Sequence, residues 1–307
     1  MFKFSHVISA PFVDRLNREY SLGGWWKAIA DDRELFVAIR DDYLNVYWKG
    51  NSLLKLRFEG GELIGETHYK YLLRPEVETQ TYVRIENGQT KLAAPANLFM
   101  PDISDLGALK SAADVYAGDE KKGVHKVVKK NPNVIDVEIA FSTEHEKTGR
   151  LTAKRIDFSA LKIAPSGPEI VFFEAKLFTN NELRAKGEVA PKVFSQLDQY
   201  RQFLSDPLNT ASLTSSYRQT CGNLAALEGV CNRYGPMLEV MKEIAANKVD
   251  LKINSVVRLV VFGFDHDQSK GDVWAPHSKK LLDELGENLL ISGDAANITR
   301  GISSPAG

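Results

Sequence analysis

Residues 169–178 have the sequence EIVFFEAKLF, and this stretch decides how the second half of the chain folds. It is rich in β-branched and aromatic residues and follows a Pro-Ser-Gly-Pro turn at residues 165–168, so it predicts a mostly buried β-strand. Side chains alternate across a strand, so Glu174 and Lys176 are expected on one face, separated by about 6.6 Å of rise. One acidic ligand and one cation can then share a single site.

Two further strands are predicted upstream. Residues 135–141 (IDVEIAF) alternate cleanly between apolar and polar positions, and residues 154–163 (KRIDFSALKI) form another strand pattern that contains Asp157. The polar segment 142–149 between them is typical of a hairpin connection, which makes the run an antiparallel meander that leads into the Glu174 strand. Asp157 and Glu174 are then expected on neighbouring strands, close enough to bind one ion.

Two carboxylates beside a lysine suit the hydrolysis of a phosphodiester. Carboxylate oxygens, phosphate oxygens and water are the ligands that Mg²⁺ prefers. Such an ion lowers the pKa of a bound water and polarises the scissile phosphate, while Lys176 orients that water or stabilises developing negative charge. The acid-x-Lys spacing alone is a weak signal, because it also occurs at residues 119, 120 and 250. The position of Glu174 in an apolar strand favours a function, because a charge placed there is desolvated.

Helices and a further strand are predicted around the meander. Residues 106–130 predict a leading helix, and residues 189–204 predict a second helix on which Gln196 and Tyr200, four residues apart, share one face. Downstream, a strand over 256–264, a helix over 278–285 and a short apolar run over 288–292 complete the pattern.

Ile156-Asp157, Glu174-Ala175-Lys176 and the run from Gln196 to Tyr200 resemble, in order and approximate spacing, the PD-(D/E)xK nuclease superfamily and its RecB-like branch, which is marked by a Gln-x-x-x-Tyr motif. The resemblance covers about residues 110–295. It implies an α/β protein with a restriction-endonuclease-like core, in which a central mixed sheet is flanked by helices. A catalytic domain is therefore expected over residues 101–307.

The resemblance also implies the roles of the motif residues. Asp157 and Glu174 would bind Mg²⁺ or Mn²⁺, and Lys176 would assist the attacking water. Gln196 and Tyr200 would contact the substrate backbone or brace the site, although they are also compatible with ordinary polar positions on a helix.

Glu138 and Arg184 are two further candidates, each with an alternative. Members of the superfamily often add an acidic residue upstream of the hairpin, so Glu138 is either a second ligand or support for Lys176, or else a solvated strand residue. Arg184 follows the Glu174 strand in a loop and could clamp a substrate phosphate with its planar guanidinium group. A loop arginine is more often simply solvated.

We therefore expect a Mg²⁺-dependent deoxyribonuclease that hydrolyses DNA phosphodiester bonds, in restriction, phage defence or repair. DNA as the substrate comes from the resemblance, because the residues themselves do not distinguish DNA from RNA. The main alternative is a non-catalytic nucleic-acid-binding or protein-binding module that keeps the nuclease fold, and a small-molecule phosphatase or other metal hydrolase is a third. Whether the chain forms a homodimer or binds a partner protein stays open.

Composition and charge limit other classes. The chain has 307 residues with 39 Lys plus Arg and 40 Asp plus Glu, and the resulting net charge of −1 argues against a protein that coats nucleic acid non-specifically. The basic run over residues 121–130 is either a local phosphate-tracking surface or a solvated helix face. No glycine-rich loop ending in Gly-Lys-Ser/Thr occurs, so no ATP-driven motor is encoded.

The sequence also bears on the location of the protein. It shows neither a signal-peptide pattern nor a run of about 18 apolar residues, so a cytoplasmic protein without membrane spans is expected. The two cysteines, Cys221 and Cys231, are expected to be reduced thiols in a helical region. Two cysteines are too few for the four-cysteine iron–sulfur cluster of some RecB-like nucleases.

The first hundred residues predict a smaller β-rich domain, over residues 1–100, for substrate or partner recognition. A helical stretch over 11–20 precedes short strands over 35–40, 43–48 and 53–58, with turns at 41–42, 50–51 and 60–61. The aromatic residues of this region either form its core or stack on bases; they are Trp25, Trp26, Tyr43, Tyr47, Trp48 and Tyr69.

Two histidine clusters are expected to be solvated loops. Asp265-His266-Asp267 and Glu144-His145-Glu146 combine imidazole with carboxylate groups. Neither cluster has a second histidine at the spacing of metal ligands.

Overall fold

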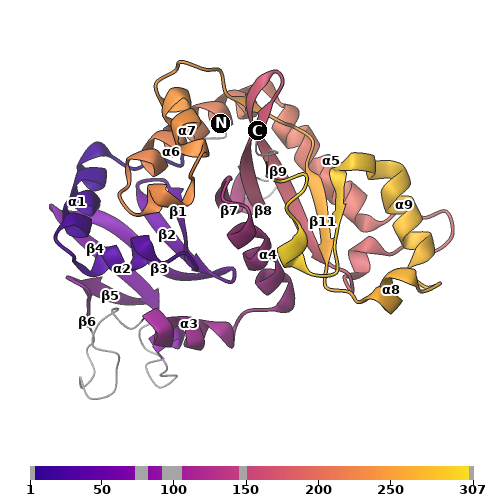
Figure 1. Cartoon of the computed structure of the whole chain (residues 1–307), viewed down its shortest axis with the longest axis horizontal. Coiled ribbons are helices and arrows are strands. Elements are labelled where there is room, and N and C mark those ends of the chain that lie inside the picture. The colour runs from indigo at the N-terminus through magenta and orange to yellow at the C-terminus, as the bar shows by residue number, and fades with distance from the viewer. Residues whose placement is uncertain (1–3, 73–81, 92–105, 145–150, 304–307) are drawn as a thin grey trace. The chain divides into compact units, whose positions relative to one another are not determined.

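The computed structural model describes residues 4–72, 82–91, 106–144 and 151–303 (Figure 1). The chain divides into two compact units. The six-strand unit comprises Ser5–Gly118 and Ser216–Ala246, and the mixed-sheet unit comprises Met1–Phe4, Asp119–Ser215 and Asn247–Gly307. Helix α6, which spans Pro207–Ala226, carries the chain from the mixed-sheet unit into the six-strand unit. A division into separate domains at residue 100 stays a prediction.

The sheet of the six-strand unit is antiparallel and follows chain order from β1 to β6. Each strand therefore pairs with the strand before it and the strand after it, as a meander requires. The strands are β1 (Phe36–Arg40), β2 (Tyr43–Trp48), β3 (Asn51–Glu59), β4 (Glu62–His68), β5 (Tyr82–Glu86) and β6 (Gln89–Lys91).

Two hairpin turns of this sheet show why the chain reverses where it does. Lys49 and Gly50 have φ values of 46° and 70°, and Asn87 and Gly88 have φ values of 51° and 76°. A two-residue hairpin turn of type I′ has positive φ at both central residues, which Gly50, Asn87 and Gly88 adopt at little cost, whereas Lys49 is a less usual residue there. The turn predicted at residues 50–51 therefore lies one residue earlier, because Asn51 already belongs to β3.

Helices pack on this sheet and complete the core of the six-strand unit. Phe12 and Leu16 of α1, Trp26 of α2, and Leu44 and Leu56 of the sheet are fully buried, with exposed fractions of 0%. The helical elements are α1 (Ala10–Ser21), α2 (Trp25–Asp31), η1 (Tyr69–Leu72), α3 (Leu106–Asp114), η4 (Val230–Arg233) and α7 (Met237–Ala245).

The second sheet is mixed and has the order β12-β11-β9-β8-β7. β7, β8 and β9 form an antiparallel meander, whereas β11 pairs in parallel with both β9 and β12. The prediction of an α/β protein in which a β-rich N-terminal part precedes a mixed sheet with helices is confirmed; that the N-terminal strands form one antiparallel sheet is a finding of the structure. The strands are β7 (Val134–Glu144), β8 (Leu151–Ala164), β9 (Gly167–Leu177), β10 (Lys252–Ile253), which pairs with β9, β11 (Arg258–Phe262) and β12 (Leu289–Ile291).

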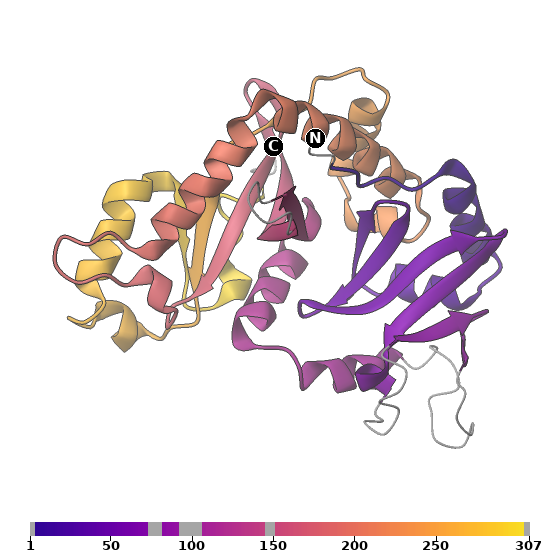
Figure 2. The same ribbon diagram turned by 180° about the vertical axis from the view of Figure 1, so that it is seen from behind.

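Helices cover both faces of the mixed sheet (Figures 1 and 2). Phe262 of β11 pairs with Leu177 of β9, and its ring packs against Gly123 of α4. Glu174 lies three residues before Leu177, so its side chain points to the other face, where Gln196 of α5 contacts it. The helical elements of this unit are α4 (Asp119–Lys130), η3 (Asn181–Leu183), α5 (Lys192–Ser205), α8 (His266–Lys270), α9 (Ala275–Leu285), η5 (Gly286–Asn288) and η6 (Ala295–Asn297).

Two helix predictions need correction. The single helix predicted over residues 106–130 is two helices, α3 and α4, separated by residues 115–118. Gly118, a poor helix former, lies in this break. The helix predicted from residue 189 begins only at Lys192, because the residue before Pro191 is restricted from the helical region.

Three smaller predictions concern the cysteines, the membrane and the hairpin tip. Cys221 in α6 is buried and Cys231 in η4 is half-buried, and both are free thiols, as predicted. None of the helices in the described part of the chain is long and apolar enough to cross a membrane. His145 and Glu146, at the predicted hairpin tip, lie outside the described residues.

Candidate active site

Strands β8 and β9 of the meander separate where the acidic residues lie. Backbone pairing of β8 with β9 ends at Phe158 and Phe173, and the next positions are Asp157 and Glu174. There Oδ2 of Asp157 accepts a hydrogen bond from the N–H of Ala175, at 2.7 Å. This bond holds the Asp157 carboxylate beside Glu174, at the position where the strand-to-strand ladder stops.

Glu174 is only 4% exposed and has two differently used oxygens. Oε1 accepts hydrogen bonds from Nζ of Lys176 at 2.9 Å and from Nε2 of Gln196 at 2.7 Å. Oε2 is also buried, and it has no hydrogen-bond partner among the described residues. Leaving a buried polar atom unsatisfied costs about 1–3 kcal/mol, and more for a charged group. This oxygen therefore keeps an acceptor capacity that the described residues do not use.

Lys176 lies between two carboxylates and is 7% exposed. Its Nζ is 2.9 Å from Oε1 of Glu174 and 2.8 Å from Oε2 of Glu182, in the turn that follows β9. Burial lowers the pKa of Lys176, but the two carboxylates raise it by more, so its pKa lies above the ordinary lysine value. Lys176 is therefore an ammonium ion at neutral pH, and it acts as a hydrogen-bond donor and not as a base.

Gln196 and Tyr200 of α5 join the site to the helix that covers this face. Nε2 of Gln196 donates to Oε1 of Glu174 and also to the hydroxyl of Tyr200, at 2.9 Å. The Tyr200 hydroxyl in turn donates to the backbone carbonyl of Arg155 on β8. Burial raises the pKa of Tyr200, and the Glu174 carboxylate raises it further. The spacing of four residues thus produces one continuous chain of hydrogen bonds from β8 to β9.

The electrostatics of the site are dominated by carboxylates. The pKa of Asp157 is raised well above its ordinary value, first by burial and then by the negative charge of Glu174, with smaller contributions from Glu138 and Glu120. Burial also raises the pKa of Glu174, although Lys176 lowers it. The negative charges outnumber the single buried ammonium group, so the cluster favours the uptake of a proton or of a cation.

Glu138 of β7 lies level with Asp157, because the pairs of β7 with β8 continue in one register on both sides of it. Its φ of 51° is unusual for a residue other than glycine. Its carboxylate forms ion pairs with Arg155 at 3.6 Å and with Lys121 at 4.0 Å. The carboxylates paired with Lys176 are those of Glu174 and Glu182, and the role of Glu138 stays a prediction.

Two acidic residues contribute to the site without having been assigned to it from the sequence. Oε2 of Glu120, on α4, accepts hydrogen bonds from the N–H of Leu177 at 3.1 Å and from Nδ2 of Asn180 at 3.3 Å. Glu182 pairs with Lys176. The position of Glu182 in the loop directly after β9 was a usable signal, whereas Glu120 lies 57 residues before Leu177 and gave none.

Arg184 turns back onto its own loop. Its Nη1 donates to the carbonyl oxygens of Phe178 at 2.5 Å and Asn180 at 3.1 Å. Its guanidinium group lies over the rings of Phe178 and Trp274, with its central carbon 5.1 Å and 5.4 Å from the ring centroids. These contacts order the loop beside the site, so the predicted phosphate clamp would have to use the remaining N–H groups of Arg184.

The basic run over residues 121–130 forms helix α4, the same helix that supplies Glu120. Several of its lysines are exposed, and Nζ of Lys126 lies 3.6 Å from Oδ1 of Asp294. Both interpretations of this run, a phosphate-tracking surface and a solvated face, are compatible with these positions.

The aromatic residues of the six-strand unit fall into two groups. Trp26 is fully buried and Tyr47 is 9% exposed, so at these two positions core packing is the correct interpretation. The half-buried members are Trp25, Tyr43, Trp48 and Tyr69.

The Asp265-His266-Asp267 cluster is an exposed helix start. Asp265 caps α8 by accepting a hydrogen bond from the N–H of Gln268 at 2.8 Å. The cluster is therefore solvated, as predicted, although it begins a helix and is not a loop.

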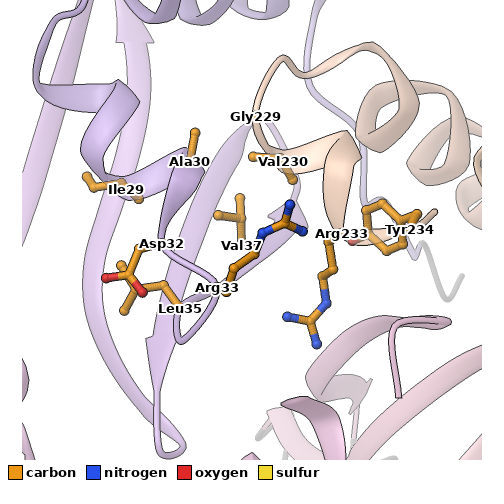
Figure 3. Close-up of a pocket in the computed structure, with 10 residues that line it drawn as sticks. All are labelled: Ile29, Ala30, Asp32, Arg33, Leu35, Val37, Gly229, Val230, Arg233 and Tyr234. Atoms are coloured by element: carbon orange, nitrogen blue, oxygen red, sulfur yellow. The ribbon is translucent and has the colours of Figure 1, made fainter. Parts of the chain in front are cut away.

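A small pocket of the six-strand unit lies between α2, β1 and η4 (Figure 3). Arg33 and Arg233 both line it, and burial lowers the pKa of Arg233. Its volume of about 20 Å³ has room for roughly one water molecule. This pocket is too small for a nucleotide or a polymer, so it is not a substrate site.

The residues at the strand separation fit a hard divalent cation. The buried Oε2 of Glu174 and the carboxylate of Asp157 are oxygen ligands of the type that Mg²⁺ prefers. Within the described ranges, no group of three or more His, Cys, Asp or Glu residues is placed to hold a metal ion. A pair of carboxylates is nevertheless usual for Mg²⁺ that is bound jointly with substrate phosphates and water.

Comparison with protein-family models, with curated proteins and with solved structures finds no match to this chain.

Proposed function

We propose that this chain is a metal-dependent nuclease that hydrolyses DNA phosphodiester bonds and is similar to the RecB-like branch of the PD-(D/E)xK superfamily. The observation that carries the proposal is a cluster of residues from three elements around Glu174, whose buried Oε2 has no hydrogen-bond partner among the described residues. A salt bridge with a purely structural role would be expected to satisfy both oxygens of Glu174. The clustered residues are Asp157, Glu174, Lys176, Gln196 and Tyr200.

The order of the elements supports the same proposal. α4, the meander β7–β8–β9, α5 and then β11, parallel to β9, follow the order expected of a restriction-endonuclease-like core. Many functions share one fold, so this agreement adds to the argument from the site and does not replace it.

The contacts of each residue support a specific role. Asp157 and Glu174 would hold Mg²⁺ or Mn²⁺, which, when bound, polarises a phosphate and lowers the pKa of water. Lys176 stays protonated between its two carboxylates, and its third N–H can donate to a phosphate oxygen or to the attacking water. Gln196 fixes Oε1 of Glu174, and Tyr200 fixes Gln196, so the orientation of the Glu174 carboxylate is held from the helix side.

DNA is proposed as the substrate because the resemblance points to it. The exposed lysines of α4 follow Glu120 on the same helix and offer contacts to a phosphate backbone. If they are used, DNA affinity falls steeply as the salt concentration rises, because each neutralised phosphate releases counterions.

The test is cleavage of plasmid, linear and single-stranded DNA, and of RNA, by the full chain with Mg²⁺, Mn²⁺ or EDTA. Cleavage with a divalent cation and none in EDTA is expected. Lys176→Ala and Glu174→Gln should each reduce the rate by at least about a hundredfold, the size of effect seen when one electrostatic group is removed from an active site. Lys279→Ala is the matched control, because Lys279 is an exposed helix lysine paired with Asp283.

The alternative function, a non-catalytic binding module that keeps the fold, predicts a different outcome. DNA or a protein partner would then bind without being cut under any metal condition, and Glu174→Gln would leave that binding intact. Turnover of a chromogenic phosphoester without any cutting of polymers would instead indicate a small-molecule phosphatase.

A further inference from the structure

A pocket of the mixed-sheet unit has a volume of about 580 Å³. It is lined by residues of β8, β11 and β12 and by the segment around η6. Part of its wall is apolar, including Leu289, Leu290 and Ile298. Three cationic side chains also line it, and these are Lys162, Arg258 and Arg300.

Two of these cations are half-buried and share a single neutral acceptor. Nζ of Lys162 and Nη1 of Arg258 both donate to the carbonyl oxygen of Gly301, at 3.0 Å and 2.8 Å. Neither forms an ion pair within 4.0 Å with a carboxylate of the described residues, although Glu287 also lines the pocket. Like charges at partly desolvated positions repel each other, and an anion between them would relieve that repulsion.

The titration of Lys162 is consistent with this geometry. Burial lowers the pKa of Lys162, and the neighbouring charge of Arg258 lowers it further. Glu169 and Glu287 act in the opposite direction, but their effect is smaller. Burial and the charge of Arg258 together thus outweigh the two carboxylates at Lys162.

This pocket lies on the face of the sheet opposite the candidate active site. Arg258 pairs with Phe173 and Leu259 pairs with Glu174, so the side chains of Arg258 and Glu174 point to opposite faces. Lys162 pairs with residue 169, five positions before Glu174, and its side chain also belongs to the face away from Glu174. A phosphate held by the carboxylate cluster cannot be the ligand of this pocket.

We propose that this pocket binds the phosphate group of a nucleotide, either free or at the end of a nucleic-acid strand. The planar guanidinium groups of Arg258 and Arg300 can each contact two phosphate oxygens, and Lys162 adds a point charge. The volume lies within the roughly 300–1,000 Å³ of small-molecule sites, and the apolar wall offers a surface for a base. This site is independent of the proposed nuclease activity.

The test is the affinity of the full chain for phosphate probes in EDTA, measured by titration calorimetry. The probes are dAMP, deoxyadenosine, and one short oligonucleotide with and without a 5′-phosphate. At least one of the two phosphorylated probes should bind saturably, and its unphosphorylated counterpart should bind at least about tenfold more weakly. Preference for dAMP indicates a free nucleotide, and preference for the phosphorylated oligonucleotide indicates a strand end, so either result supports the proposal.

Variants locate the binding. Arg258→Gln and Arg300→Gln should each weaken it by about tenfold, whereas Arg258→Lys should weaken it less. Arg201→Gln, at an exposed arginine of the same unit, should leave it unchanged, and so should Glu174→Gln, which separates this site from the candidate active site. Arg300 is exposed, so its variant decides the question if Arg258→Gln fails to fold. No saturable binding of any phosphorylated probe, or equal binding by Arg300→Gln, would overturn the proposal.

Discussion

At the scale of single residues, the charge of Asp157 opposes folding when no cation is bound. Its pKa is raised, first by burial and then by Glu174. A carboxyl group with a raised pKa in the folded state contributes stability below its unfolded-state pKa, and that contribution is lost as the pH rises through the folded-state pKa. Above that pH, the folded chain carries an ionised group in a place that favours the neutral acid. A preorganised metal site would have this property, because its carboxylate charge is unfavourable until a cation binds.

Asp157→Asn is therefore expected to stabilise the chain in EDTA at pH 8, by on the order of 1 kcal/mol. The asparagine amide oxygen can still accept the hydrogen bond from Ala175, so the local geometry survives. Near pH 4, at about the unfolded-state pKa of aspartate, the difference should disappear. Urea unfolding at the two pH values measures it, and a variant less stable than the wild type at pH 8 would contradict this interpretation of Asp157.

Mg²⁺ should reverse the order of stability, so that the wild type becomes more stable than Asp157→Asn. Binding to the folded state alone should stabilise the wild type by about 1.4 kcal/mol for each tenfold increase in Mg²⁺ above the dissociation constant. Asp157→Asn and Glu174→Gln should lose this dependence, because each removes one oxygen charge from the site. Thermal unfolding across a Mg²⁺ series measures the effect, and Lys279→Ala should respond as the wild type does. The same slope in all the variants would place the ion elsewhere.

Tyr200→Phe tests the chain of hydrogen bonds on α5. The variant removes the donor to the carbonyl of Arg155 and one of the two acceptors of Gln196, in a side chain that is 4% exposed. A loss of about 1 kcal/mol in the free energy of unfolding is expected, together with a several-fold slower nuclease reaction. Tyr82→Phe is the control, since Tyr82 is 51% exposed, and it should change neither quantity. If Tyr200→Phe is as stable as the wild type, the inference that Tyr200 braces Gln196 is wrong.

The contacts of the candidate site could be predicted only in part from the sequence. Asp157, Glu174 and Lys176 were placed together by strand alternation, and Gln196 with Tyr200 by the four-residue helix spacing. Their chemical roles stay predictions. Glu120 could not be predicted, because its contact with the end of β9 depends on how α4 packs against the sheet.

At the scale of elements, the meander was predictable because each of its strands carries its own alternation. The pairing of β11 with β9 is a long-range choice, and only the resemblance pointed to a mixed sheet. The break at residues 115–118 was missed, because both flanking segments have helical composition and only Gly118 marks the gap. Local patterns fix an element, whereas its ends and its partners depend on tertiary contacts.

Gly123→Ala tests how closely α4 packs on the sheet. Alanine has the better helix propensity by about 1 kcal/mol, but its methyl group would overlap the ring of Phe262. Net destabilisation of about 1–3 kcal/mol is expected, as for other overpacked cores. Phe262→Leu should relieve the overlap, so the double variant should lose less stability than the two single changes combined. Additive losses in urea unfolding would show that the two residues do not meet.

At the scale of the whole molecule, the chain leaves the six-strand unit at residue 118 and returns to it at residue 216. Within that unit, the backbone N–H of His6 donates to Ser216 at 2.7 Å, and the Thr220 hydroxyl donates to the carbonyl of His6 at 2.8 Å. Segments distant in the sequence therefore complete one another, a feature that composition alone does not show.

A fragment of residues 119–307 should therefore fold incompletely. Residues 216–246 would lose the N-terminal partners that bury them in the six-strand unit. Their amide hydrogens should exchange much faster than in the full chain, or the fragment should aggregate, because the exposed apolar surface has no cover. Hydrogen exchange measured by mass spectrometry compares the two chains. Equal protection of residues 216–246 in both would support a division near residue 100.

The central claim is that Asp157 and Glu174 hold a divalent cation at which DNA is cut. Its most direct test is the anomalous X-ray signal of crystals grown with Mn²⁺ and a short DNA duplex. The account predicts an anomalous peak within ligand distance of one carboxylate oxygen of Asp157 and of Oε2 of Glu174, with a DNA phosphate on the same ion. Crystals that contain Mn²⁺ and DNA but show no peak between these two carboxylates would contradict it.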